Sequence, residues 1–170
     1  SRTDKAIAEA QQLWNTLANK AQRAGSGTWD WLDIRAGIPT VLPATSEAFV
    51  PQMANLDLIG GISFDKGCYP GQEIVARMHY LGRLKQRLYR AHVVSPTPPQ
   101  PGDPIHAPGL RGQSAGTVMN AHAAPDGGFD LLAVMQTASA EAGELHVGSE
   151  NGPKLRLQTL PYQVKVADRS

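Results

Sequence analysis

Eight residues in the middle of the chain combine the groups that thiol chemistry needs. They run Lys66-Gly-Cys-Tyr-Pro-Gly-Gln-Glu73 and contain Cys68, the single cysteine among 170 residues. Two glycines and a proline predict a tight turn at the thiol, with a helix beginning shortly after it. A helix N-terminus and a neighbouring ammonium group, here that of Lys66, both lower the pKa of a thiol. The run therefore predicts an accessible thiolate that can attack electrophiles or bind a soft metal.

A structural role for Cys68 is the alternative, because free cysteines are often buried as small hydrophobic residues. Turn residues on both sides favour a functional role instead. A lone thiol cannot form an internal disulfide or hold a zinc ion or an iron–sulfur cluster unaided, so we expect no stable metal site. A cysteine hydrolase needs a histidine beside the thiol. The nearest, His79, lies about two helical turns beyond the predicted helix start, and we disfavour this class.

Positive charge is concentrated around the same run. Residues 66–90 hold six basic side chains against one acid, a local net charge of +5, whereas the other residues sum to −4. Such a segment can attract phosphate or another anionic partner, although a solvated surface is the alternative. Arg35, just before the Gly37-Ile-Pro39 turn, is a further candidate for an anionic ligand.

The elements that must position these groups change type along the chain. Apolar residues at spacings of three and four predict helices over 4–24 and 71–81. The alternating Trp29 and Trp31 predict a strand over 29–38, and we expect Trp14, Trp29 and Trp31 in the core. Residues 39–65 are expected to be mostly irregular. Period-two patterns and turn residues then predict strands over 84–94, around 105, and over 116–122, 129–136, 144–147 and 155–160.

The composition is that of a turn-rich soluble protein. The chain is 41% hydrophobic and 18% charged and has 17 glycines and 13 prolines, which excludes the disordered and fibrous classes. It has no apolar run of membrane-spanning length and no N-terminal signal segment, so we expect a cytoplasmic location and no membrane partner. Because the chain starts at Ser1 without a methionine, we expect it to be the C-terminal part of a longer protein.

The run at 66–73 resembles, almost letter for letter, the KGCYxGQE signature of the YgfZ branch of the GcvT-like folate-binding family. The resemblance covers residues 29–92 closely and the later strands by architecture alone. The other runs that occur in the family's order are Ile34-Arg-Ala-Gly-Ile-Pro39, Phe49-Val-Pro-Gln52, Asn55-Leu56, Gly60-Gly-Ile-Ser-Phe64, Glu73-Ile-Val-Ala-Arg77 and residues 82–88.

This resemblance implies an α+β fold in two parts. Residues 1–83 would be the C-terminal part of a GcvT-like (ferredoxin-like) folate-binding domain, and residues 84–170 a small antiparallel β-barrel. The implied function is tetrahydrofolate-linked assembly or repair of iron–sulfur enzymes, including those that thiolate tRNA. The chain would act as an accessory factor rather than as an independent enzyme, and its partners would be iron–sulfur enzymes or cluster carriers.

The resemblance also assigns residues. Cys68 would be the functional cysteine, lending one transient ligand to a cluster that passes between proteins. Its motif neighbours are Lys66, Gly67, Tyr69, Gly71, Gln72 and Glu73. Tetrahydrofolate would be the cofactor, with Arg35 and Arg77 as binding residues. Its pocket would need the N-terminal half of the longer family members.

Two other functions stay open. The first is a folate-dependent aminomethyl or one-carbon transferase related to the T-protein of the glycine cleavage system, in which Cys68 is incidental. The second is a docking module that uses the basic segment 66–90 to bind tRNA or a protein.

Overall fold

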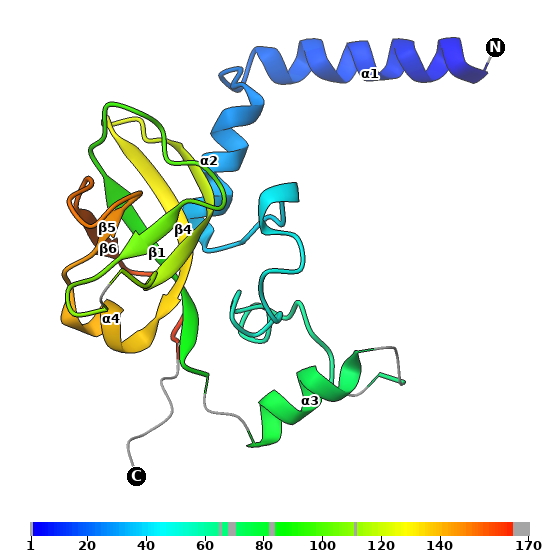
Figure 1. Cartoon of the computed structure of the whole chain (residues 1–170). Helices are drawn as coiled ribbons and strands as arrows, with labels where there is room; N and C mark the ends of the chain where they lie inside the picture. Colours follow the sequence, from blue (N-terminus) through cyan, green and yellow to red (C-terminus); the bar gives the residue numbers. More distant parts are fainter. Residues whose placement is uncertain (1, 65, 68–70, 82–83, 111, 165–170) are drawn as a thin grey trace.

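A computed structural model describes residues 2–64, 66–67, 71–81, 84–110 and 112–164 of the chain. Figure 1 shows an extended N-terminal helix, a curled sheet and a helix that stands off from the sheet. The elements are α1 (Arg2–Ala18), α2 (Ser26–Ala36), η1 (Pro43–Thr45), α3 (Gln72–Leu81), β1 (Gln86–Val93), β2 (Pro104–His106), β3 (Gly116–Ala123), β4 (Phe129–Gln136), α4 (Thr137–Ala142), β5 (His146–Val147) and β6 (Leu155–Gln158).

The six strands form one antiparallel sheet in the order β5-β2-β3-β4-β1-β6. The sheet curls until its two edges are linked by a bridge between His146 and Lys154 and by a hydrogen bond of 2.8 Å from Leu155 N–H to the Leu145 carbonyl. The α+β class and the antiparallel C-terminal sheet are thus confirmed. The ferredoxin-like segment is not confirmed, because the described residues before Gln86 form helices and turns and contain no strand.

The central strand β4 has apolar layers on both of its faces, which is why six consecutive residues, 130–135, are buried. Leu131, Ala133 and Met135 belong to the cluster inside the curl. Leu132 and Val134 belong to a second cluster on the outer face, together with Ile34, Ala54, Leu88 and Met119. Ile34 and Ala54 come from the predicted first domain, 1–83, and share this core with strands of the predicted second domain, 84–170. The division itself stays a prediction.

The strand expected over 29–38 is wrong, because residues 26–36 form α2. The helix ends at Gly37, whose φ of 70° is the left-handed conformation that glycine adopts most easily. Ile38 N–H then bonds to the Asp33 carbonyl at 2.9 Å. The alternating tryptophans imitate a strand, but on a helix they lie on different sides. Trp29 is 69% exposed, whereas Trp31 is partly buried and donates its indole N–H to Asp130 at 2.9 Å.

The helix expected over 4–24 is α1, which begins two residues earlier and ends at Ala18, and the helix expected over 71–81 is α3, which begins at Gln72. Helix α4 was not predicted. Every residue of α1 is exposed, so the expectation of a core position is wrong for Trp14 as well as for Trp29. Trp14 stacks with Arg23 instead, at 5.0 Å from guanidinium carbon to ring centre. Within the described ranges, no helix combines the length and the apolar character needed to cross a bilayer.

The close approach of β3 to β4 predicts a specific sensitivity at Gly116. A Cβ added there would lie 2.4 Å from the Val134 carbonyl oxygen and 2.5 Å from Met135 Cβ. We expect Gly116→Ala to lower the free energy of unfolding in urea by about 1–3 kcal/mol, since backbone must shift to admit the methyl group. Gly25→Ala is the matched control, because nothing lies within 4 Å of its added Cβ. Equal effects of the two changes would contradict the tight packing of β3 on β4.

Candidate functional site

The cysteine motif leads into the start of α3. Gly71 has a φ of 86°, a left-handed conformation, and α3 begins at the next residue, Gln72. The helix predicted after the thiol is therefore confirmed. Lys66, Gly67, Gly71 and Glu73 are exposed, and Gln72 is partly buried. Cys68 and Tyr69 lie outside the described residues.

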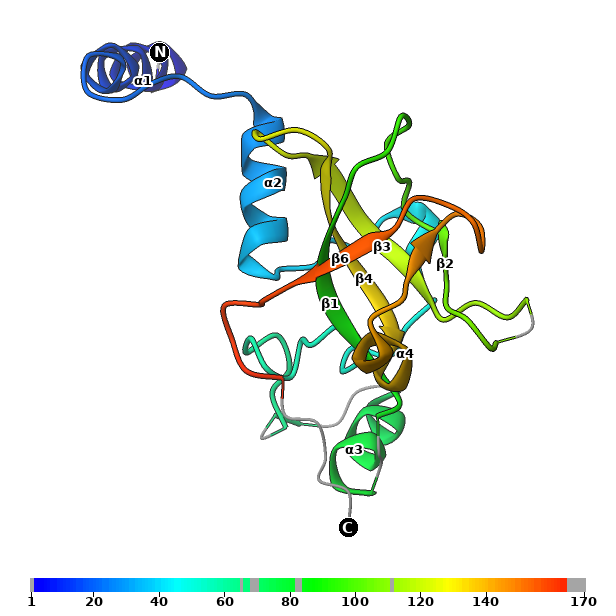
Figure 2. The same cartoon turned by 90° about the vertical axis from the view of Figure 1, so that its left-hand side faces the viewer.

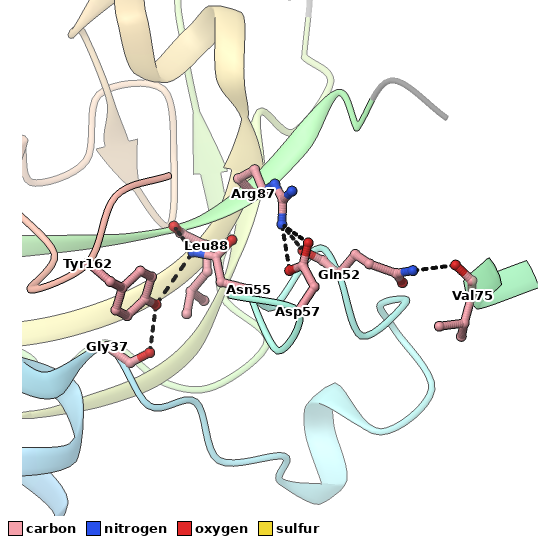
Figure 3. A network of polar contacts seen from close by, with 8 residues as sticks. All are labelled: Gly37, Gln52, Asn55, Asp57, Val75, Arg87, Leu88 and Tyr162. Carbon is pink, nitrogen blue, oxygen red and sulfur yellow. Dashed lines mark hydrogen bonds and ion pairs between the residues drawn. The ribbon is translucent and has the colours of Figure 1, made fainter. Parts of the chain in front are cut away.

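Gln52 attaches α3 to the rest of the molecule. Its side chain is 1% exposed, and its amide Nε2 donates a hydrogen bond to the Val75 carbonyl, in the first half of α3. Val75 is itself buried, at 7% exposure. Figure 3 shows Gln52 reaching from its loop toward the helix. The helix that directly follows the motif is thus held by a side chain from another part of the chain.

Arg87 on β1 holds the loop that carries Gln52. Its Nη1 donates to the Gln52 carbonyl at 2.8 Å and pairs with the Asp57 carboxylate at 2.8 and 3.1 Å. The two charged side chains are each 12% exposed. An ion pair this far from solvent is weakly screened and costly to break, because one charge would stay buried without a partner. The path from the sheet to α3 therefore runs through Arg87 and Gln52 (Figure 3).

Asn55 fixes the same loop at a second point. It is fully buried with a φ of 58°, a conformation that asparagine tolerates better than most residues. Its Nδ2 donates to the Leu88 carbonyl of β1 at 2.9 Å and lies 3.5 Å from the Tyr162 hydroxyl oxygen. Tyr162 in turn donates to the Gly37 carbonyl at 2.8 Å. This network joins the end of α2, the loop, β1 and the C-terminal segment (Figure 3).

The two arginines predicted to bind folate lie on separate elements. Arg35 is exposed near the end of α2, with its guanidinium carbon 4.9 Å from the centre of the Trp31 ring. Arg77 is exposed on α3. Both views of the molecule show α3 standing apart from α2 (Figures 1 and 2).

The basic segment 66–90 does not form one continuous exposed stripe. Lys66, Arg77 and Lys85 are exposed, but Arg87 is largely buried in its ion pair with Asp57. Arg83 lies outside the described residues. Within the described part of the chain, no three His, Cys, Asp or Glu side chains come together as a metal-binding group would require.

The residues that build the network were not singled out for any chemistry in the sequence. Gln52 and Asn55 stood only in runs that resembled a family, and Arg87 counted only as surface charge. Tyr162 carried no signal of its own. The available clue was Asn55, since asparagine next to turn residues often adopts the left-handed conformation.

Removing the Gln52 amide should loosen α3 selectively. Gln52→Met keeps the length of the side chain but deletes the donor to Val75, a loss of about 1 kcal/mol. We expect α3 amides to exchange with deuterium about fivefold faster, while β4 amides keep the parent rate. Gln100→Met is the control, because the Gln100 side chain is exposed and donates to the nearby Pro98 carbonyl, not to α3. Unchanged exchange in α3 would show that Gln52 does not anchor the helix.

The Tyr162 hydroxyl should make stability depend on pH in the alkaline range. Burial raises the pKa of the phenol above its ordinary value of 10.0, the nearby Asp57 carboxylate raises it further, and Asn55 and Arg87 oppose the shift. The unfolded phenol thus ionises first, so stability that is present below pH 10.0 is lost as the pH rises toward the folded-state pKa. The Tyr162→Phe variant has no phenol to ionise, so it does not show this loss of stability at high pH, and it also lacks the hydrogen bond to the Gly37 carbonyl.

We therefore expect Tyr162→Phe to be less stable than the parent by about 1 kcal/mol near pH 8, measured by urea unfolding. The two stabilities should converge above about pH 10. A difference that stays constant across this range would contradict the raised phenol pKa.

Comparison with known proteins finds relatives that match nearly the whole chain. No protein-family model matches the chain. It is 38% identical to tRNA-modifying protein YgfZ of Sodalis glossinidius over 163 residues, which are 95% of this chain and 49% of that protein. The proteins of the same name from Yersinia pestis (strain Pestoides F) and Yersinia pseudotuberculosis (serotype O:1b) are 38% identical over 157 residues, 92% of this chain and 48% of theirs. The chain spans about half the length of these relatives, and the match covers 95% of its own residues for the Sodalis protein, which supports its resemblance to the YgfZ family.

Proposed function

We propose that the protein serves tRNA modification as an accessory factor in the assembly or repair of iron–sulfur enzymes, acting through Cys68. The observation that carries this proposal is the 38% identity to tRNA-modifying protein YgfZ over 95% of the chain. In this role the protein would work in the cytoplasm, with iron–sulfur enzymes or cluster carriers as its partners.

The anchored helix α3 supports a chemical role for the motif that precedes it. Motif residues on both sides of Cys68, including Lys66 and Glu73, are exposed and open to a protein partner. The helix that follows is bonded to Gln52, and Gln52 to Arg87, so the C-terminal end of the motif is attached to the sheet. A reactive group is positioned most precisely when the element that carries it is rigid.

A single thiolate suits transfer of a cluster better than storage. The cluster is cargo here: Cys68 would lose its proton, contribute one sulfur ligand to iron, and regain a proton when a client takes the cluster. The remaining ligands would come from the carrier or the client. No change of oxidation state is required of this chain.

Tetrahydrofolate would need a larger pocket than the described residues form. Two buried acceptors in the network, Gln52 Oε1 and Asn55 Oδ1, lack a protein partner among the described residues. Both are closed to solvent and so cannot meet a ligand. Arg35 and Arg77 are exposed but lie on different elements. These residues do not fit a folate site by themselves.

The aminomethyltransferase alternative is not favoured, because the relatives carry the name of a tRNA-modifying protein. The two functions differ in their demand on the thiol. A folate-dependent transferase would keep its activity without Cys68, whereas cluster transfer through this residue would not.

The test replaces Cys68 in a chimera in which this chain substitutes for the matching 163 residues of the Sodalis protein. In a bacterial strain that lacks its own relative, we expect Cys68→Ala and Cys68→Ser to lower thiolated tRNA, measured by mass spectrometry, at least tenfold relative to the parent chimera. Ser63→Ala, a change at an exposed position of the loop before the motif, is the control.

A second measurement on the 170-residue chain itself examines the thiol directly. The rate at which iodoacetamide alkylates Cys68 should rise with pH, and the midpoint of this rise should lie below the ordinary thiol pKa of about 8.5. A thiol that is inert in the folded chain and reactive after unfolding would sink the proposal, as would full tRNA thiolation by the Cys68→Ala chimera.

A further inference from the structure

A basic groove lies beside β1 and β6, on elements that are distant in sequence from the cysteine motif. Its volume is about 590 Å³. His92, Lys154 and Arg156 line it together with Val94 and apolar residues of β6, and none of its described lining residues is acidic. Lys154 and Arg156 are exposed, so their charges are available to a partner.

The pairing of β1 with β6 brings the charges onto one face of the sheet. His92 is directly opposite Arg156, and Arg90 is directly opposite Gln158. Opposite residues, and residues two apart on a strand, share a face. Arg90 and Arg156 therefore lie on the same outer face, and Lys154, two residues before Arg156, lines the groove beside them.

Helix α2 adds a fourth cation beside this face. Arg90 donates from Nη1 to the Arg35 carbonyl at 3.1 Å and from Nε to Gln158 Oε1 at 2.7 Å. These bonds use two of the five N–H donors of the guanidinium. The Arg35 guanidinium is exposed over Trp31. Figure 2 shows β6 crossing in front of β1, with α2 to the left of the strands. We call Arg35, Arg90, Lys154 and Arg156 the basic face.

The acid opposite His92 on the neighbouring strand β4 is engaged within the protein. Asp130 is opposite His92, but its side chain is only 8% exposed. One carboxylate oxygen contacts His92 Nδ1 at 2.8 Å, and the other accepts the Trp31 indole N–H at 2.9 Å. The carboxylate is thus occupied within the protein. Asp30 lines a separate hollow beside Asn120.

We propose that the basic face binds the phosphate backbone of tRNA. This inference rests on the proposed function and adds a docking surface to it. Guanidinium groups match phosphate oxygens in a two-pronged geometry. Four exposed or partly exposed cations, beside a groove whose described lining has no acidic residue, favour a polyanion. Backbone contacts of this kind position an RNA without reading its sequence.

The basic face differs from the basic run in the sequence. Only Arg90 belongs to both. Arg87 is paired with Asp57 at 12% exposure, and Lys66 and Arg77 lie at the motif and on α3. The docking surface is therefore assembled from α2, β1 and β6 and not from residues 66–90 as a whole.

The test measures binding of an unmodified tRNA transcript to the 170-residue chain by fluorescence anisotropy, between about 50 and 200 mM salt. We expect the double variant Lys154→Gln/Arg156→Gln to bind about tenfold more weakly and to reduce the slope of log K against log salt by about 1.5. Lys20→Gln/Arg23→Gln is the control, since it removes the same two residue types from exposed positions far along the chain. It should stay within about twofold of the parent.

Arg35→Gln is a second variant that leaves β6 untouched, in case the double variant unfolds. We expect about threefold weaker binding from it. Parent-like binding by the groove variants, or equal losses in the control, would overturn the proposal. Displacement of the tRNA by poly-glutamate as effective as by unlabelled tRNA would overturn it in favour of an acidic protein partner. Absence of any tRNA binding would overturn it too, while leaving the Cys68 chimera result as an independent test of function.

Discussion

The ion pair between Arg87 and Asp57 is the interaction on which the site depends. Both charges are largely removed from water, which is tolerable only because each meets the other at 2.8 Å and because Arg87 also bonds to the Gln52 carbonyl. The loop is thereby held against β1, and Gln52 can reach Val75 in α3. Without this compensation the helix that follows the cysteine motif would lose its connection to the sheet.

Strand β1 serves two regions at once. Successive side chains of a strand point to opposite faces, so Arg87 and Arg90 lie on different sides of the same strand. Arg87 supports the loop beside the motif, and Arg90 joins α2 and β6 in the basic face. Full pairing of β1 with β4 over eight residues gives both arginines a rigid base.

Periodicity predicted the strands well because each buries a regular set of side chains. The strand expected over 129–136 coincides with β4, and the helix expected over 71–81 with α3. The same reasoning failed at Trp29 and Trp31, where two aromatic residues in alternation suggested a strand. Trp29 is exposed, whereas Trp31 is partly buried and bonds to Asp130 on β4, a residue 99 positions away. A short pattern carries no information about such a contact.

The sequence by itself determined the motif, the helix that follows it, the strand pattern and the family, since these depend on local residue types and their order. Only the tertiary structure decided which charges are available. Arg87 and Arg90 are the same residue type three positions apart. Arg87 forms an ion pair with Asp57, whereas Arg90 bonds to the Arg35 carbonyl and to the Gln158 side chain. Lys154 and Arg156 join Arg90 through strand pairing alone. Electrostatic interactions act across space and are set by burial, so a charge run in the chain does not show where the charged surface lies.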